Sequence, residues 1–241
     1  GSELIEYPQQ KHLPDEYIIK KLSEFWEEDM PDGDVTTLST IPDETFIQAE
    51  IHAMEELVFA GNTIIPHCFG KGCQVEINSD DGDFLSRGDV IGIIGGPAQD
   101  ILSRERVMLN LVQRLCGIAT VAQQYAKLAD PYNVKILDTR KTTPGIRLFE
   151  KYAVVIGGAY NHRLNLSDGI LIKDNHIVSA GSINKAIESA RKSGGGFPLE
   201  VEVDNLDQIK ESLILGVDGF LLDNMDVNNI RTAVSIIRQF E

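Results

Sequence analysis

The sequence predicts an α/β protein in which an N-terminal α+β open sandwich precedes an atypical parallel α/β barrel that is incomplete at its C-terminal end. In the first part of the chain, short alternations of apolar and polar residues are separated by Gly and Asp turns, a pattern typical of half-buried strands. From residue 134 onward, strand and helix patterns alternate, and repeated units of this kind form a parallel sheet. We therefore predict two domains. They are residues 1–105, which include the start of a long helix, and residues 106–241, from which the last barrel strands are missing.

The first domain begins with a helix. Pro14 is a typical first helical residue, and Pro31-Asp32-Gly33 ends the helical pattern. Residues 47–53 then alternate strictly between apolar and polar, which indicates a half-buried strand. Further short strands are predicted at residues 57–60, 74–77 and 90–94.

A long helix connects the two domains. Its apolar residues recur every three or four positions and form one stripe: Ile101, Met108, Leu111, Leu115, Ile118, Ala122 and Tyr125. Gly117 lowers the helix propensity in the middle of this segment, which indicates close packing there. The predicted strands of the second domain follow at residues 134–138, 170–173, 199–204 and 217–223, and helices headed by Ser182, Asn205 and Asp226 alternate with them.

Composition excludes several classes of protein. The 241 residues are 42% hydrophobic, enough for a sizeable core, so the chain is not disordered. The net charge of −15 argues against a nucleic-acid binder. No apolar run approaches the roughly 18 residues of a membrane span, and no secretory leader opens the chain. Three cysteines without paired spacing suit a reducing compartment. We expect a cytoplasmic protein with neither a nucleic-acid nor a membrane partner.

Charged residues stand where the predicted parallel strands end. They are Asp138 with Arg140 and Lys141, then Lys173, then Glu202 and Asp204, and finally Asp223. In a βα barrel this end of the strands carries the active site. A single charged residue at a strand end is more often a solvated loop residue, but the recurrence of charge after all four strands favours a site.

The first part of this set is locally basic. Residues 139–173 contain six Lys or Arg and two acids, a local charge of +4 in a chain of −15. His162 lies in the same segment and can gain a proton near neutral pH. Arginine in particular matches the two oxygens of a carboxylate or phosphate. The segment therefore predicts an anionic substrate.

The strand predicted at residues 199–204 has the opposite character. Its apolar residues occupy one face, and Glu200, Glu202 and Asp204 occupy the other. If the acidic face points into the barrel, these carboxylates need a metal or the basic segment as partners. Carboxylates of this kind commonly bind magnesium. The alternative is an exposed edge strand with a polar face.

Several motifs together resemble the quinolinate phosphoribosyltransferase family. The most characteristic is Asp138-Thr139-Arg140-Lys141-Thr142-Thr143-Pro144-Gly145. Others are residues 33–37, 105–107, 150–154, 161–163, 172–176, 200–203 and 221–225, so the resemblance runs in order from about Asp34 to Met225. It implies transfer of 5-phosphoribose from phosphoribosyl pyrophosphate to the ring nitrogen of quinolinate, with release of carbon dioxide and pyrophosphate and with help from Mg²⁺. It also implies a homodimer in which the sandwich of one subunit covers the barrel mouth of the other, so that the active sites are shared.

The resemblance also implies roles for individual residues. The quinolinate carboxylates would be bound by Arg140, His162, Arg163 and Lys173, and by Arg106 from the partner subunit. Lys141 would serve the pyrophosphate or the ribose phosphate. Glu202 and Asp223 would hold magnesium and the ribose hydroxyls, and would offset positive charge as the sugar approaches an oxocarbenium ion.

The end of the chain departs from the family. Four predicted parallel strands are too few to close a barrel, and in the family further βα units carry a Gly-rich phosphate loop. We therefore expect the native protein to continue past Glu241 with at least one more strand and such a loop. Two alternatives stay open: a truncated, non-catalytic homologue that still dimerises, and a phosphoribosyltransferase of the nicotinate type.

Overall fold

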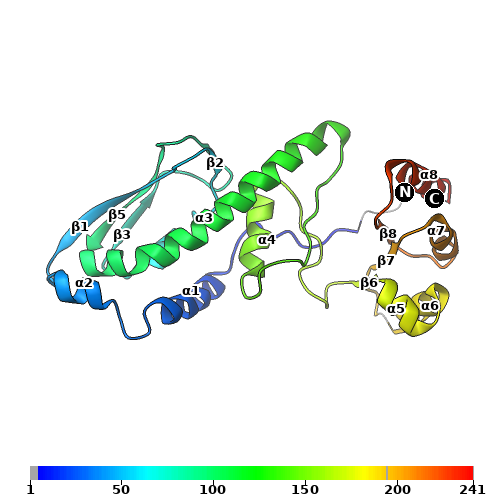
Figure 1. Ribbon diagram of the computed structural model, residues 1–241, viewed down its shortest axis with the longest axis horizontal. Helices are drawn as coiled ribbons and strands as arrows, with labels where there is room; N and C mark the ends of the chain where they lie inside the picture. Colours follow the sequence, from blue (N-terminus) through cyan, green and yellow to red (C-terminus); the bar gives the residue numbers. More distant parts are fainter. Residues whose placement is uncertain (1–4, 194, 241) are drawn as a thin grey trace. The chain divides into compact units, whose positions relative to one another are not determined.

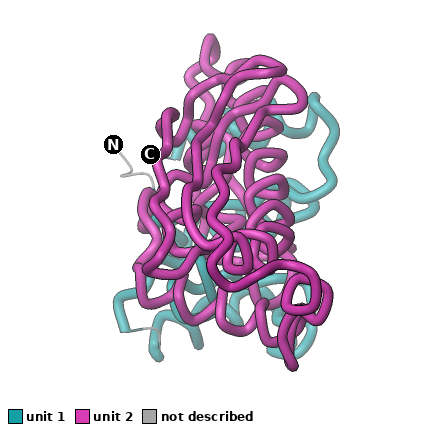
Figure 2. Tube along the Cα trace, turned by 90° about the vertical axis from the view of Figure 1, so that its left-hand side faces the viewer, with its two compact units in different colours: residues 1–7, 163–241 teal, residues 8–162 magenta. Residues whose placement is uncertain are grey.

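The computed structural model describes residues 5–193 and 195–240, which form two compact units (Figure 2). Unit 2 comprises Pro8–His162, and unit 1 comprises Gly1–Tyr7 with Arg163–Glu241. The boundary predicted between residues 105 and 106 lies inside one continuous helix of unit 2. Among the described helices, none is both long and apolar enough to cross a membrane.

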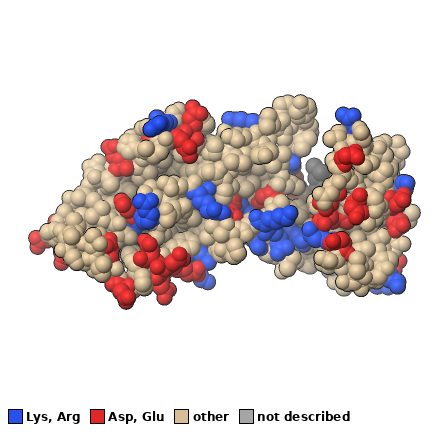
Figure 3. Space-filling model, viewed as in Figure 1, with Lys and Arg blue, Asp and Glu red and all other residues tan. Residues whose placement is uncertain are grey.

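Unit 2 begins with two helices. Helix α1 (Asp15–Asp29) follows Pro14 as predicted, and it buries Ile18 and Leu22. Helix α2 (Val35–Thr40) is capped by the carboxylate of Asp34, which accepts a hydrogen bond from the Thr37 backbone. Figure 3 shows acidic side chains gathered over α1, in which six of 15 residues are acidic. A surface helix thus carries a large share of the negative net charge.

The strands of unit 2 form two small antiparallel ladders. Strand β5 (Val90–Pro97) lies between β1 (Phe46–His52) and β3 (Gln74–Ile77), which confirms three predicted strands. Strand β2 (Leu57–Val58) is shorter than predicted, and it pairs with β4 (Phe84–Leu85), which the sequence did not predict. The 3-10 helix η1 (Ile65–Cys68) lies between β2 and β3.

Helix α3 (Ala98–Ala129) runs along this sheet and confirms the predicted long helix (Figure 1). Its stripe is buried at Ile101, Met108, Leu111 and Leu115, but Tyr125 is exposed. Gly117 was expected to mark close packing, and no such packing occurs among the described residues of one chain. A Cβ built at this glycine meets nothing within 4 Å, because residue 117 lies on the solvent side of α3.

The strand predicted at residues 134–138 is not formed. The segment follows the 3-10 helix η2 (Asp130–Tyr132) and makes one isolated parallel bridge, between Leu137 and Tyr160. The pairing ends after this bridge, where the Asn161 side chain donates to the Asp138 carboxylate and to the Lys151 carbonyl, and Leu137 stays 52% exposed. Helix α4 (Arg147–Ile156), which was not predicted, lies between the two bridged segments and packs Phe149, Tyr152 and Ala153 into the core.

Unit 1 is a parallel sheet with helices. Strands β6 (Ile170–Ile172), β7 (Leu199–Val203) and β8 (Gly219–Leu222) are neighbours in that order. The helices are α5 (Asp174–Ala180), α6 (Ile183–Ser193), α7 (Leu206–Leu213) and α8 (Val227–Phe240). Three of the four predicted parallel strands and the three helices predicted after Ser182, Asn205 and Asp226 are confirmed. Closure of the sheet into a barrel stays a prediction.

The two faces of this sheet differ in character. Ile172, Val201 and Val203 are buried with residues of α6, α7 and α8 such as Ile187, Ile209 and Ala233. Because side chains alternate along a strand, residues 171, 173, 200, 202 and 221 share the opposite face. The predicted acids of the sheet therefore lie on the face that does not carry the unit 1 core.

Candidate active site

The loop of residues 138–143, called the basic loop below, carries Arg140 and Lys141 and begins at a buried ion pair. Nζ of Lys151 lies 2.5 Å from Oδ1 of Asp138, and the two side chains are 1% and 7% exposed. The Asp138 carboxylate also accepts hydrogen bonds from Asn161 Nδ2 at 2.7 Å and from the His162 backbone at 2.8 Å. Buried charges are stable only when they are paired and hydrogen bonded, and both conditions are met here.

The same lysine reaches the segment that carries His162. Lys151 Nζ donates to the His162 backbone carbonyl at 3.0 Å, and the neighbouring Asn161 side chain donates to the Lys151 carbonyl at 2.9 Å. Gln9 exchanges two hydrogen bonds with the Asn161 backbone, at 2.7 and 3.0 Å. The segment before His162 is therefore held from both sides, by α4 and by residues near the N-terminus.

The far end of the loop is held by Glu150. Its Oε2 accepts from the Thr143 backbone at 3.1 Å, and its Oε1 accepts from Arg114 Nε at 2.8 Å. Arg114 also donates to Thr143 Oγ1 at 2.6 Å. Burial by itself would raise the pKa of Glu150, but the hydrogen bonds from Arg114 and Thr143 outweigh it. The pKa therefore lies below its usual value of 4.5, and the group stays ionised.

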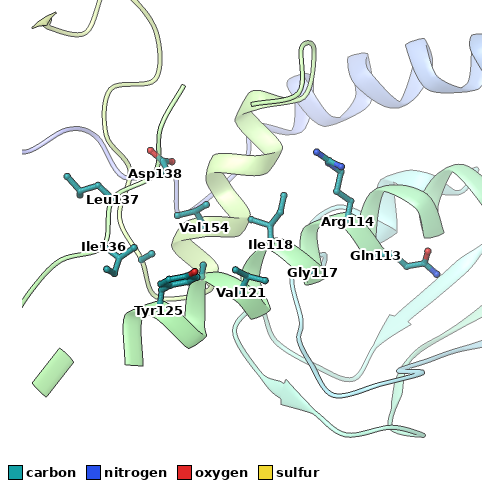
Figure 4. A pocket seen from close by; sticks show the side chains of 12 residues that line it. Gln113, Arg114, Gly117, Ile118, Val121, Tyr125, Ile136, Leu137, Asp138 and Val154 are labelled. Carbon is teal, nitrogen blue, oxygen red and sulfur yellow. The ribbon is translucent and has the colours of Figure 1, made fainter. Parts of the chain in front are cut away.

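An open, mostly apolar hollow of about 700 Å³ lies between α3, α4 and residues 136–138 (Figure 4). Asp138 lies at one end of it, and Gln113 and Arg114 lie at the other. Arg140, Lys141 and His162 are not among the residues that line it. The hollow is therefore beside the basic loop and does not by itself define an anion site.

In unit 1, two of the predicted residues form an ion pair at the carboxyl ends of the strands. Lys173 Nζ lies 2.7 Å from Glu202 Oε2, with side chains 42% and 16% exposed. The register, in which Ile172 pairs with Val201, places Lys173 beside Glu202. Asp223 follows β8, and its backbone donates to the Val203 carbonyl at 2.9 Å. Alternation puts its side chain on the same face as Glu202. Lys173 and Glu202 therefore lie together, and Asp223 lies at the end of the neighbouring strand β8.

Arg163 is buried in unit 1 and is only 6% exposed. Its Nη1 donates to the Gly169 carbonyl at 3.0 Å. Tyr7 lies against the same glycine, because a Cβ built at Gly169 would be 2.8 Å from Tyr7 Oη. Tyr7 donates to Glu200 Oε2 at 2.8 Å. Burial, and then the nearby Glu200 carboxylate, raise the pKa of Tyr7 far above 10, so the phenol keeps its proton and remains a donor.

Arg106 lies on an exposed stripe of α3. It shares this stripe with Asn110, Gln113 and Gly117, which follow at intervals of four, three and four residues. All four positions are exposed in the single chain. The side chain of Arg106 therefore points away from the core of unit 2.

Sequence reasoning did not find the residues that bind and position the predicted site residues. Tyr7, Gln9, Glu150 and Lys151 were not predicted as site residues. One signal was available for the partner of Glu200, because a row of carboxylates on one strand face predicts that each needs a partner. No signal pointed to residues 7 and 9, which are more than 150 positions away from the groups they bind.

Comparison with known proteins identifies the relatives of this chain. The sequence profiles described as "Quinolinate phosphoribosyl transferase, N-terminal domain" and "C-terminal domain" match residues 34–116 and 118–241. A Bacillus subtilis protein named "Probable nicotinate-nucleotide pyrophosphorylase [carboxylating]" is 44% identical over 218 residues, which cover 89% of this chain and 75% of that protein. The Mycobacterium leprae "Nicotinate-nucleotide pyrophosphorylase [carboxylating]" is 39% identical, with 83% and 72% covered. The solved nicotinate-nucleotide pyrophosphorylase of Francisella tularensis superposes with a TM-score of 0.91 at 36% identity, over 97% of this chain and 84% of that one.

Proposed function

The chain belongs to the quinolinate phosphoribosyltransferase family, and we propose that it transfers 5-phosphoribose from phosphoribosyl pyrophosphate to the ring nitrogen of quinolinate. The products are nicotinate mononucleotide, carbon dioxide and pyrophosphate, so the enzyme would act in NAD biosynthesis. The observation that carries this proposal is the basic loop. Its two adjacent cations, Arg140 and Lys141, lie between hydrogen-bonded anchors at Asp138 and Thr143, as a rigid anion-binding loop requires.

Both substrates are anions, and we assign cations to each of them. Arg140 and His162 of unit 2, and Arg163 and Lys173 of unit 1, would bind the two carboxylates of quinolinate through charge-assisted hydrogen bonds. Lys141 would neutralise the pyrophosphate or the ribose phosphate, where a compact ammonium serves as a point charge.

Glu202 and Asp223 would hold the ribose hydroxyls and Mg²⁺. Magnesium is usually bound through one or two carboxylates together with substrate oxygens and water, so two carboxylates on one sheet face suffice. Among the described residues there is no cluster of three or more metal-ligating side chains, which fits a metal that arrives with its substrate rather than a closed protein site. When bound, the ion would neutralise pyrophosphate charge.

The chemistry needs positioning more than proton transfer. Pyrophosphate leaves readily once its charge is neutralised, and the pyridine nitrogen is already a nucleophile. As the bond from the ribose carbon to pyrophosphate breaks, the sugar gains positive charge, which the carboxylates of Glu202 and Asp223 would offset. Once the ring nitrogen is quaternary, the adjacent carboxylate leaves as carbon dioxide. Its electron pair stays on the ring carbon, which then takes a proton.

We also propose a homodimer with shared active sites, in which Arg106 reaches the quinolinate of the partner subunit. Support comes from the exposed stripe of α3. An exposed glycine inside a 32-residue helix lowers stability by about 1 kcal/mol relative to Ala, and no described residue comes within 4 Å of a Cβ built at Gly117. A second copy that packs closely on this stripe would account for the glycine.

The cellular setting is proposed on similar grounds. Cys68, Cys73 and Cys116 are free thiols, which suits a reducing cytoplasm. A net charge of −15 disfavours nucleic acid as a partner.

The purified protein should be assayed with phosphoribosyl pyrophosphate and either quinolinate or nicotinate. Release of carbon dioxide from quinolinate labelled in the carboxylate beside the nitrogen is the expected result. Use of nicotinate alone would show a nicotinate-type enzyme. A dimer that uses neither ring would be the non-catalytic homologue.

A further inference from the structure

Two adjacent residues of α4 hold opposite ends of the basic loop. Lys151 binds Asp138, which lies two residues before Arg140. Glu150 binds the backbone of Thr143, which lies two residues after Lys141. We propose that Glu150 and Lys151 are a positioning pair that fixes Arg140 and Lys141 for the two anionic substrates, an inference that rests on the proposed function.

The pair can serve both ends because of helix geometry. Successive side chains on an α-helix diverge by roughly 100°, so neighbouring residues point in different directions. Glu150 and Lys151 therefore do not bind each other, although their charges are opposite. Each takes a different partner in the loop, and the six-residue span from Asp138 to Thr143 is fixed at both ends.

Lys151 positions the residues that are assigned to quinolinate. Its ammonium donates both to Asp138 and to the His162 carbonyl, so it fixes the two unit 2 segments assigned to the quinolinate carboxylates. Because its side chain is only 1% exposed, Lys151 acts through these segments and not on substrate directly. It is a positioning residue and not a catalytic one.

Glu150 positions Lys141, the residue that is assigned to phosphate. Glu150 connects Thr143 to Arg114 of α3, and Arg114 adds its own hydrogen bond to the Thr143 hydroxyl. The carboxylate therefore fixes the loop where it leaves Lys141, the residue assigned to phosphate. Loss of this anchor should disturb Lys141 more than His162, which is held through Lys151.

Stability alone does not account for the buried ion pair. Replacing such a pair by apolar residues of similar size is often neutral or stabilising, whereas removal of one partner leaves a buried charge alone. A packed apolar pair would hold α4 in place equally well. An apolar pair would, however, make no directional hydrogen bonds to residue 138 or to the His162 backbone. The start of the basic loop and the His162 segment would then no longer be fixed in position.

The test uses the whole protein and four variants. Lys151→Met removes the ammonium, and Asp138→Asn with Lys151→Met removes both charges, so that no charge is left buried alone if the single variant does not fold. Glu150→Gln removes the charge that faces Arg114 and replaces one carboxylate oxygen by an NH2 group, so the side chain can no longer accept from both Thr143 and Arg114. Lys127→Met, on the exposed side of α3, is the matched control and should be unchanged in every readout.

Each folded variant is measured for kcat, for the KM of each substrate and for quinolinate affinity by calorimetry. We expect the Lys151 variants to raise the quinolinate KM and Kd at least tenfold, and Glu150→Gln to raise mainly the KM of phosphoribosyl pyrophosphate. A merely structural role would reduce the active fraction and hence kcat, and would leave both KM values unchanged. That outcome, or no change at all, overturns the proposal. A wild-type protein that binds and turns over no quinolinate would instead overturn the proposed function itself.

Discussion

Gly117→Ala tests the proposed subunit contact with a change of one methyl group. Of residues 5–193 and 195–240, none lies within 4 Å of the new Cβ, and residue 117 lies deep inside a 32-residue helix. Ala is favoured over Gly in a helix interior by about 1 kcal/mol, so the monomer should become more stable by that amount. For a protein of this size the gain corresponds to a rise in Tm of about 2–4 °C.

The same methyl group should weaken the dimer. Adding a methylene to a packed contact costs about 1–3 kcal/mol. A two-fold symmetric contact contains the substitution twice. At about 1 kcal/mol per subunit, the loss is about 2 kcal/mol, which raises the dimer dissociation constant roughly 30-fold. Because the active sites would be shared, activity per subunit should fall at concentrations where the wild type remains dimeric and the variant does not.

Urea unfolding at concentrations where both proteins are monomeric measures the first effect, and analytical ultracentrifugation measures the second. Gly157→Ala is the opposite-sign control, because its Cβ would press on the Ala119 carbonyl and lie 2.7 Å from the Ala122 Cβ. It should destabilise the protein at every concentration. If Gly117→Ala leaves the dimer dissociation constant unchanged, residue 117 does not lie in the subunit contact. If it lowers the free energy of unfolding of the monomer, the space around residue 117 is not open.

Three further predictions concern the site. Glu202→Gln should reduce kcat at least tenfold while quinolinate affinity changes little, since the acid is assigned to the ribose and the metal; equal losses in both would show that it acts on the pyridine through its ion pair with Lys173. Mixing inactive Arg106→Ala and Lys173→Ala subunits should restore part of the activity, because one composite site per heterodimer is then intact; heterodimers without activity would mean that each site is built within one chain. The pKa of Glu150 is lowered in the folded state, so its contribution to stability is present above pH 4.5 and is lost as pH falls through the folded pKa. The difference in urea midpoint between wild type and Glu150→Gln should therefore shrink from pH 6 to pH 3, and a constant difference would show that the ionised carboxylate adds no stability through Arg114.

The sheet of unit 1 was predictable because one face of each strand is buried. The alternation in residues 199–203 places Val201 in the core and Glu202 on the other face, and the structure has this arrangement. Side-chain alternation with a period of two also fixed which charged residues share that face, before any partner was known. Lys173 and Glu202 are therefore neighbours because of strand register, which sequence patterns determine well.

The strand at residues 134–138 was predicted wrongly for a related reason. An apolar run indicates a strand only if a partner strand is available to pair with it. Here Leu137 bridges a single residue, Tyr160, because the chain at Asn161 turns to bind Asp138 and Lys151. The pairing possibilities of a segment depend on distant residues, and no local pattern contains that information.

Helix α4 was missed because it buries charge. Pattern reading assigns charged residues to the exposed face of a helix, yet Glu150 and Lys151 are 7% and 1% exposed. Residues 147–156 are amphipathic, but two of the five buried positions carry a charge, which such a reading does not expect. Exceptions to the rule that charged residues lie on the exposed face of a helix are expected at functional sites.

The burial of these charges gives the fold a specificity that apolar packing could not provide. Apolar contacts are non-directional, so a loop packed against Leu or Met could shift by a few tenths of an ångström at little cost. A carboxylate that must satisfy three donors, as Asp138 does, has few alternative positions, since each unmade hydrogen bond of a buried charge is costly. The loop between Asp138 and Thr143 is consequently held in one place before substrate arrives. For a reaction that depends on neutralising two anions in a fixed geometry, such preorganisation lowers the barrier because the loop need not be ordered during the reaction.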